Sequence, residues 1–161
     1  MKKIVIFMLC IFMLFGCQNQ KSEEDIQFEN YSYIKTQLIE RNDFDDNDSF
    51  RIQLIFNPID EQYRYDIIID QPKVTMYDIT AMSYANENDE TMCPNIGIFD
   101  SNEMNLKKDF VDKELGFYKG IQLSGKVKQV QSIKVYVSYY TDEKKTQKIE
   151  KYIEVSENEI R

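Results

Sequence analysis

The clearest structural pattern in the chain is IKVYVSYY at Ile133–Tyr140, followed after a polar segment by KIEKYIEV at Lys148–Val155. Apolar residues recur at alternate positions in both stretches: Ile133, Val135, Val137 and Tyr139, then Ile149, Ile153 and Val155. Because successive side chains of a strand point to opposite faces, this period of two predicts two strands with one buried face. The polar segment 141–146 between them completes an antiparallel β-hairpin.

The same alternation recurs upstream of the hairpin. We predict further strands at residues 49–57, 63–70, 74–84, 96–99 and 117–127. Pro58 should end the first of them, because proline cannot donate to a strand ladder. Seven or so short strands separated by turns predict an all-β fold, a two-sheet sandwich of immunoglobulin-like or fibronectin-like type. The Cys and Trp pair of true immunoglobulins is absent, since the chain has no Trp.

Three segments fit this pattern less well. Residues 18–30 are polar and predict a flexible tether. Residues 31–41 fit either a helix, through Tyr31, Ile34 and Leu38, or a strand, which we favour. Residues 102–115 are charged and poor in β-formers, so a helical turn at one end of the fold is expected there.

The N-terminus has the layout of an export signal. Lys2 and Lys3 precede the apolar run Ile4–Phe15, whose 12 residues are too few for a span of roughly 20. The run ends in Leu14-Phe15-Gly16-Cys17, which resembles the lipobox of bacterial lipoprotein precursors. That resemblance implies cleavage between Gly16 and Cys17 and attachment of diacylglycerol to Cys17, although Phe15 is bulkier than usual for this motif. An ordinary secretory signal or a short anchor is the alternative.

We therefore expect a signal peptide at residues 1–16, a lipidated cysteine and tether at 17–30, and one β-sandwich domain at 31–161. Two acyl chains suffice for stable attachment, which predicts a lipid-anchored protein on the extracytoplasmic face of a cell membrane. Scarce alanine beside abundant Ile, Lys, Asn and Tyr is typical of AT-rich bacterial genomes and favours a Gram-positive source.

The composition excludes several classes of partner and of catalytic site. Removing Lys2 and Lys3 leaves 18 basic residues against 28 acidic ones, and an acidic domain disfavours nucleic acid as a partner. The chain has no histidine, so Ser-His and Cys-His catalysis and His-ligated zinc are excluded. Cys93 lacks an intramolecular disulfide partner in the mature chain and is expected to be a half-buried structural thiol.

Three segments resemble ligand-binding motifs. Gly120–Lys126 matches the start of a phosphate-binding P-loop, but Val127 replaces the Ser or Thr that reaches Mg²⁺, so a strand with two glycines is the better interpretation. Asp43, Asp45 and Asp48 are weak candidates for Ca²⁺ ligands, with a solvated loop as the alternative. The run 87–90 has the same two interpretations. No cofactor is predicted.

Tyr136, Tyr140 and Tyr152 fall on the outward side of the predicted hairpin and could form an interaction face, or simply cover the sheet in cross-strand pairs. Our first hypothesis is a non-enzymatic, membrane-anchored module that binds another envelope protein. The alternative is a solute-binding or Ca²⁺-binding lipoprotein, for which a pocket with convergent polar groups would be the distinguishing feature. A carboxylate-dependent hydrolase ranks third, because no pair of acids stands out.

Overall fold

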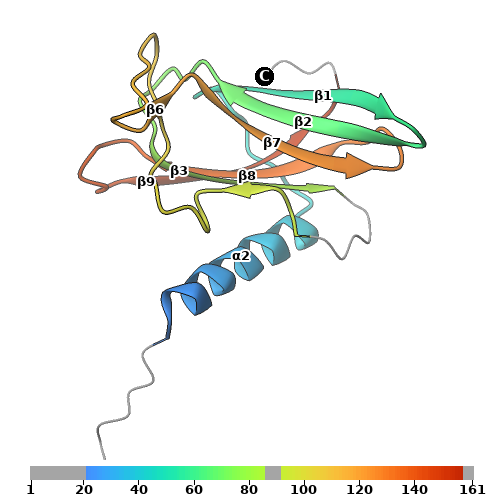
Figure 1. Cartoon of the computed structure of the whole chain (residues 1–161), viewed down its shortest axis with the longest axis horizontal. Helices are drawn as coiled ribbons and strands as arrows, with labels where there is room; N and C mark the ends of the chain where they lie inside the picture. The colour runs from blue at the N-terminus through green and yellow to red at the C-terminus, as the bar shows by residue number, and fades with distance from the viewer. Residues whose placement is uncertain (1–20, 86–91, 158–161) are drawn as a thin grey trace, which may run out of the picture.

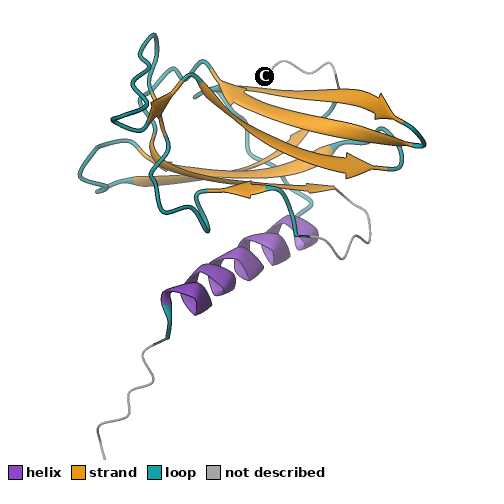
Figure 2. Cartoon of the chain, in the orientation of Figure 1, coloured by secondary structure: helices purple, strands orange, loops and turns teal. Residues whose placement is uncertain are grey.

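The computed structural model of the chain describes residues 21–85 and 92–157. Two β-sheets face each other, and helix α2 (Glu23–Glu40) lies against the outer side of one sheet, so the molecule has three layers (Figure 1). Strands dominate, as Figure 2 shows, which confirms the prediction of a mainly β fold. Among the described residues, no helix has the length and apolarity needed to cross a membrane.

The first sheet has three antiparallel strands in the order β1-β2-β7. They are β1 (Arg51–Ile59), β2 (Gln62–Asp70) and β7 (Gly120–Val127). Pro58 does not end β1 as predicted, but pairs opposite Tyr63. The proline is tolerated because β1 is an edge strand, where a missing N–H removes no ladder bond. The P-loop-like segment lies in β7, as the strand interpretation requires.

The second sheet has the order β4-β3-β8-β9. Its strands are β3 (Tyr77–Ala85), β4 (Asn95–Ile96), β8 (Ile133–Tyr140) and β9 (Lys148–Val155). Strands β8 and β9 pair in one continuous antiparallel register, which confirms the predicted C-terminal hairpin. A short parallel pair, β5 (Asn105–Leu106) and β6 (Phe117–Tyr118), closes one end of the sandwich.

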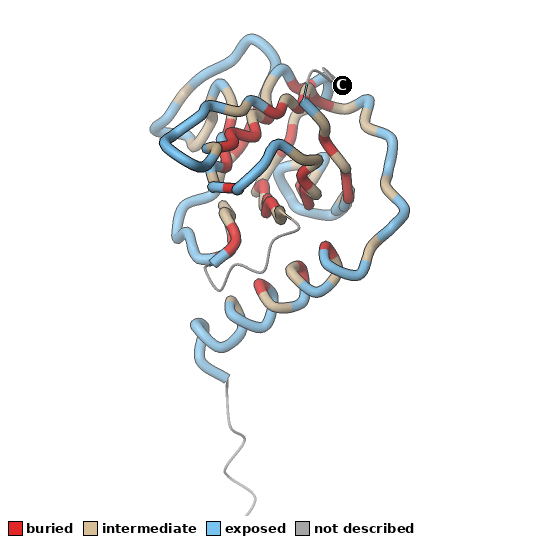
Figure 3. The backbone as a smooth tube through the Cα atoms, turned by 90° about the vertical axis from the view of Figure 1, so that its right-hand side faces the viewer, coloured by how far each residue is buried: buried red, intermediate tan, exposed pale blue. Residues whose placement is uncertain are grey.

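The main core fills the space between the sheets. Fully buried side chains from both sheets meet there, including Ile52, Ile67, Ile69, Ile79, Val135, Val137 and Ile153. Figure 3 shows the buried residues concentrated in the strands, whereas α2 is buried only on the side that faces them. The predicted inward set of the hairpin, from Ile133 to Val155, belongs to this core.

The segment from residue 23 to residue 40 corrects two predictions, because it is neither a tether nor a strand. Ser22 is the N-cap of α2: its hydroxyl accepts from the Asp25 N–H at 3.2 Å, and the Asp25 carboxylate accepts from the Ser22 N–H at 3.1 Å. Acidic residues in the first helical turn stabilise the positive end of the helix dipole. The first turn of α2 consists of residues 23–25, which were predicted to belong to the tether.

The helix is held by one stripe of side chains and by a cap at its other end. Tyr31, Ile34 and Leu38, spaced three and four residues apart, are the buried residues of α2. At the C-terminus, the Lys134 ammonium donates to the carbonyls of Arg41 at 2.7 Å and Ile39 at 3.3 Å. A cation at this position satisfies carbonyls that have no partner within the helix.

The charged segment 102–115 contains β5 but no helical turn, so that prediction is also wrong. Lys107 and Phe110 close one tight turn, and Asp112 and Phe117 close a second. The Asp112 carboxylate accepts from the N–H groups of Glu114 and Leu115, and the Gly116 N–H donates to the Lys113 carbonyl, which closes a single turn.

Candidate functional site

The tyrosine face predicted on the hairpin does not exist as an exposed surface. Tyr136 and Tyr152 do point away from the main core, but α2 covers them, leaving 3% and 6% of their surface exposed. Their rings lie 5.0 Å apart, and the guanidinium carbon of Arg41 lies 3.8 Å from the Tyr152 ring centroid. The prediction failed because the helix that covers this sheet was not recognised.

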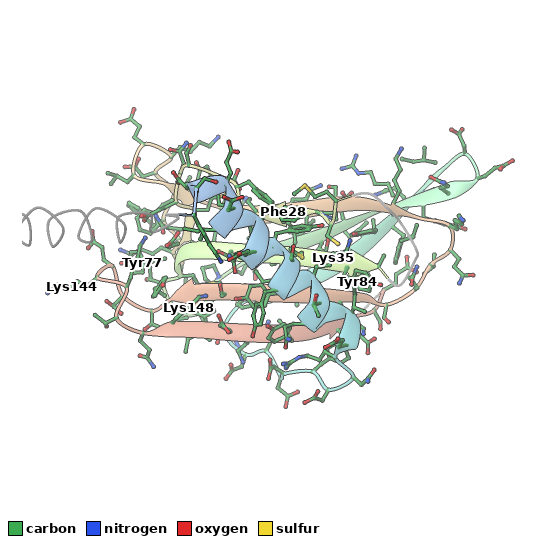
Figure 4. All side chains as sticks on the ribbon, turned by 90° about the horizontal axis from the view of Figure 1, so that it is seen from below. Phe28, Lys35, Tyr77, Tyr84, Lys144 and Lys148 are labelled. Carbon is green, nitrogen blue, oxygen red and sulfur yellow. The ribbon has the colours of Figure 1, made fainter. Side chains whose placement is uncertain are left out.

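These tyrosines belong to a second hydrophobic core, which lies between α2 and the second sheet. Burial raises the pKa of the Tyr136 hydroxyl, and the Glu150 carboxylate, which accepts its hydrogen bond at 3.0 Å, acts in the same direction. Tyr140 lies opposite Tyr77 in the β3–β8 register and is half-buried. In Figure 4, α2 runs across this sheet, with Lys35 and Tyr84 along one side and Lys148 on the other. The three tyrosines therefore do not form one exposed patch.

Cys93 lies beneath α2 as a buried free thiol. Its backbone N–H donates to the Tyr31 hydroxyl at 2.8 Å, which ties the loop before β4 to the helix. Burial raises the pKa of Tyr31. Cys93 is thus more deeply buried than the half-buried thiol that the sequence predicts.

The acidic segment before β1 covers a sheet edge. The N–H of Asp45 donates to the carbonyl of Tyr152 at 2.7 Å, and the Asp45 carboxylate accepts from the Tyr152 N–H at 2.7 Å. Asp48 accepts from the Ser49 hydroxyl, at 3.3 Å. Within residues 21–85 and 92–157, no three acids, cysteines or histidines gather as metal ligands, so Asp43, Asp45 and Asp48 are not brought together. Gly16, Cys17 and the run 87–90 lie outside the described residues.

The structure instead assembles a groove that the sequence did not indicate. Its volume is about 670 Å³. It lies between the start of β1, the end of β2 and the loop that joins β5 to β6. Four lysines line it, together with an arginine, two aspartates, a glutamine and three apolar residues: Lys73, Lys107, Lys108, Lys119, Arg51, Asp70, Asp109, Gln71, Pro72, Phe110 and Val111. We call this site the lysine groove.

The wall that carries Lys107 and Lys108 is a well-ordered turn. The Phe110 N–H donates to the Lys107 carbonyl at 3.3 Å, and Asp109 has a φ of 56°, a left-handed conformation that Asp tolerates better than most residues. The Phe110 ring packs edge-on against Phe117, with centroids 5.2 Å apart, and Phe117 packs in the same way against Tyr77. This aromatic series fixes the turn to the sandwich.

The opposite wall holds a neutralised ion pair and one further lysine. Arg51 donates two hydrogen bonds to Asp70, from Nε at 2.7 Å and from a terminal nitrogen at 2.5 Å. The hydrogen bonds that Arg51 donates to Asp70 raise the pKa of Arg51. Next to this pair, the Lys73 N–H donates to the Ser49 carbonyl at 2.7 Å, which positions the lysine at the groove.

The four lysines give the groove an excess of positive charge. None of them forms an ion pair with a carboxylate of residues 21–85 and 92–157, and Asp109 is the one acid lining the groove outside the Arg51–Asp70 pair. The chain as a whole has a net charge of −8. At physiological salt, charges beyond about 8 Å are strongly screened, so the local lysines dominate the potential inside the groove.

Lysine ammonium groups around a concave site can bind phosphate or carboxylate groups. The exposed parts of Phe110 and Val111 add apolar contact, and the volume lies in the range of about 300–1,000 Å³ that small-molecule sites occupy. The dibasic pair Lys107-Lys108 did not mark the groove in the sequence, because Lys2-Lys3 and Lys144-Lys145 are pairs of the same kind.

The fold and the groove define the chain as a helix-covered β-sandwich protein with a basic concave site. No protein-family model, curated protein or solved structure matches the chain.

Proposed function

We propose that this chain is a non-enzymatic, membrane-anchored extracytoplasmic lipoprotein that binds a small anionic ligand in the lysine groove. The observation that carries the proposal is the gathering of Lys73, Lys107, Lys108 and Lys119 in one groove without carboxylate partners from the described residues. The hypothesis of a tyrosine-based interaction face loses its support, because α2 buries Tyr136 and Tyr152.

The ligand class follows from the groove lining. Lysines bind as hydrated point charges without the planar fork of arginine, so they suit phosphate and carboxylate groups in varied geometries. Phe110 and Val111 favour a ligand that also has an apolar part. We infer a compact organic phosphate or polycarboxylate rather than a nucleic acid, which the net acidity of the chain repels.

A lipid anchor at Cys17 would keep the domain near the membrane. Residues 18–22 separate Cys17 from the first residue of α2, and a chain of that length spans at most about 20 Å. Lipidation at Cys17, a proposal based on the lipobox, would therefore hold the domain close above the bilayer. A Gram-positive cell membrane remains the proposed location.

The strand order also supports a finer fold assignment. With the short β5 and β6 set aside, the first, second and fifth strands form one sheet, and the fourth, third, sixth and seventh form the other. In immunoglobulin constant-type domains the fourth strand belongs to the sheet of the first two, whereas here β4 pairs with β3. We infer a fibronectin-like rather than an immunoglobulin constant-like sandwich.

Ligand binding is tested by calorimetric titration of the full chain, purified in detergent, with inorganic tripolyphosphate and with citrate. We expect saturable binding of at least one probe, weakened by added salt. The double substitution Lys107→Gln/Lys108→Gln should raise the Kd about tenfold or more, since loss of about 1.4 kcal/mol of binding energy is a tenfold change.

The matched control is Lys113→Gln/Lys144→Gln, which removes the same charge from two exposed lysines outside the groove. It should change the Kd less than twofold. Equal weakening by both double variants would show a general charge effect, and no heat of binding for either probe would refute an anion site.

The anchor is tested separately, by intact mass and membrane fractionation of the wild type and Cys17→Ala in a bacterial host. The wild type should begin at an acylated Cys17 and fractionate with membranes, whereas the variant should lack the acyl mass. Release of both proteins as soluble chains would contradict lipid anchoring without affecting the groove.

A further inference from the structure

The ion pair with Asp70 occupies only one edge of the Arg51 guanidinium. Asp70 accepts from Nε at 2.7 Å and from the terminal nitrogen Nη2 at 2.5 Å. A guanidinium has five N–H donors in a planar fork, so three donors remain, two on Nη1 and one on Nη2. In the described part of the chain, no other group accepts a hydrogen bond from Arg51. The edge formed by Nη1 and Nη2 can therefore donate two parallel hydrogen bonds to a second oxyanion.

The first sheet holds Arg51 in place and keeps it accessible. Arg51 pairs in register with Asp70, and Asp70 pairs in register with Gly120 of β7. A Cβ atom at Gly120 would lie 2.9 Å from the Asp70 Cβ, so a glycine leaves the Asp70 side chain the room that it needs. The Arg51 side chain is 30% exposed, against 16% for Asp70. A ligand thus meets a cation that is already ordered, which lowers the entropic cost of binding.

The two walls of the lysine groove offer different kinds of donor. Of the arginines in the described ranges, Arg41 lies over the Tyr152 ring and Arg64 pairs with Asp66, so Arg51 is the one that lines the groove. On the facing wall, the ammonium group of Lys107 lies 5.0 Å from the Phe110 ring centroid. Arginine supplies a rigid fork that matches an oxyanion bidentately, whereas lysine supplies a point charge.

We propose that Arg51 is the specificity-determining residue of the lysine groove, where its free edge binds one phosphate or carboxylate group of the ligand while the lysines of the facing wall bind a second. This inference rests on the proposed function. The ligand is thus a compound with at least two anionic groups. The charges agree with this class, because four lysines face a single aspartate, Asp109, outside the neutral Arg51–Asp70 pair.

The substitution Arg51→Lys separates this role from a purely structural one. Lysine keeps the positive charge and can still pair with Asp70, but it has no second edge with two parallel donors. The full chain in detergent is titrated by calorimetry with inorganic tripolyphosphate and with citrate. We expect the Kd of the bound probe to rise about tenfold in Arg51→Lys, the usual scale of a lost bidentate contact.

The matched control is Arg64→Lys, the same substitution at another ion pair of the first sheet. Arg64 donates from Nε to Asp66 at 3.0 Å and lies outside the lysine groove. This variant should change the Kd less than twofold. A comparable loss of affinity in both variants would show that the effect arises from the sheet rather than from the groove, and would overturn the role of Arg51.

A second measurement uses the wild type and is independent of how well Arg51→Lys folds. Two hydrogen bonds to one oxyanion slow rotation of the terminal nitrogens, so NMR should show Arg51 Nη–H signals that sharpen and saturate with tripolyphosphate or citrate, while those of Arg64 stay unchanged. An ion pair of purely structural role would give no such response.

The outcomes distinguish this inference from the proposed function. Arg51 Nη–H signals that do not respond at saturating probe, or a folded Arg51→Lys whose Kd changes less than twofold, would overturn the role of Arg51. If Lys107→Gln/Lys108→Gln still weakened binding in that case, the lysine groove would stand as an anion site. Absence of binding of both probes to the wild type would overturn the proposed function and this inference together.

Discussion

Asp66 shows how a single buried carboxylate stabilises the first sheet. It is 7% exposed and accepts hydrogen bonds from Ser124 at 2.6 Å, Gln122 at 2.9 Å and Arg64 at 3.0 Å. Burial alone raises the pKa of Asp66, but these three hydrogen bonds outweigh burial and leave the pKa below its usual value. The ionised form is therefore the form that stabilises the fold.

We predict that Asp66→Asn lowers the free energy of unfolding at pH 7 by about 1–3 kcal/mol, because charge-assisted hydrogen bonds are lost. A carboxyl with a depressed folded pKa stabilises above its unfolded pKa of about 3.9, and this contribution disappears as the pH falls through the folded value. Urea unfolding at pH 7 and below pH 4 should show the difference between wild type and variant shrinking with acid. A difference that stays constant with pH would contradict this role.

Gly125 permits a close approach across the sheet. It is paired in register with Tyr65, and a Cβ atom at Gly125 would lie 2.5 Å from the Tyr65 ring. The Tyr65 hydroxyl lies 3.1 Å from the Ser83 hydroxyl of the facing sheet, so the ring has little freedom to move away.

Gly125→Ala should destabilise the fold by about 1–3 kcal/mol, the usual effect of overpacking. In a Tyr65→Ala background the same substitution should cost much less, since the clashing ring is gone. Thermal or urea unfolding of the four chains in this cycle provides the measurement, and an equal cost in both backgrounds would exclude the clash as the cause.

At the level of single residues, the sequence predicted which strand positions face the core between the sheets, but not their polar partners. The alternation in Ile133–Tyr140 depends only on local periodicity. The Asp66 network instead joins residues from β2 and β7, which are distant in sequence, and the register between them cannot be read from either strand alone.

At the scale of elements, α2 covers the outer face of the second sheet and determines which of its residues are exposed. It packs Tyr31, Ile34 and Leu38 against Met82, Cys93, Ile98, Tyr136 and Tyr152, forming a core separate from the one between the sheets. Exposed apolar residues elsewhere on the helix, such as Ile26 and Tyr33, blur its amphipathic pattern. Several apolar residues also fit a period of two, which is why the strand was preferred.

Leu38 is fully buried on the face of α2 that packs against the second sheet, whereas its neighbour Ile39 is 46% exposed. Leu38→Ala should cost about 2–5 kcal/mol through lost burial and the cavity it leaves, and Ile39→Ala should change stability by about 0.5 kcal/mol or less. Loosening of the helix should also increase alkylation of Cys93, followed by mass spectrometry of the peptide that contains it. Unchanged alkylation in Leu38→Ala would mean that α2 does not protect the thiol.

A better sequence prediction of this element was available from its cap. Ser22 and Asp25 form an N-terminal capping pair directly before Tyr31, Ile34 and Leu38, whose spacing is helical. The polar composition of residues 18–30 instead favoured the prediction of a flexible tether. The hairpin was predictable because its two strands and their turn are contiguous, so no distant element had to be placed.

At the scale of the whole molecule, charge is distributed unevenly. The chain is acidic overall, yet four lysines meet in the groove between the start of β1, the end of β2 and the loop that joins β5 to β6. Net charge alone argues against nucleic acid as a partner but does not indicate a site for a small anion. Composition could not reveal the groove. Lys73 and Lys107 come together only because the loop between β5 and β6 packs against the sandwich, through the contact of Phe110 with Phe117.

The most direct test of the central claim is to locate the bound anion by NMR. Amide and lysine side-chain signals of the full chain in detergent micelles are followed during titration with inorganic tripolyphosphate. We predict saturable shifts concentrated at Lys73, Lys107–Val111 and Lys119, which disappear in Lys107→Gln/Lys108→Gln. Shifts confined to other faces, or spread evenly over all exposed lysines, would contradict the lysine groove as the binding site.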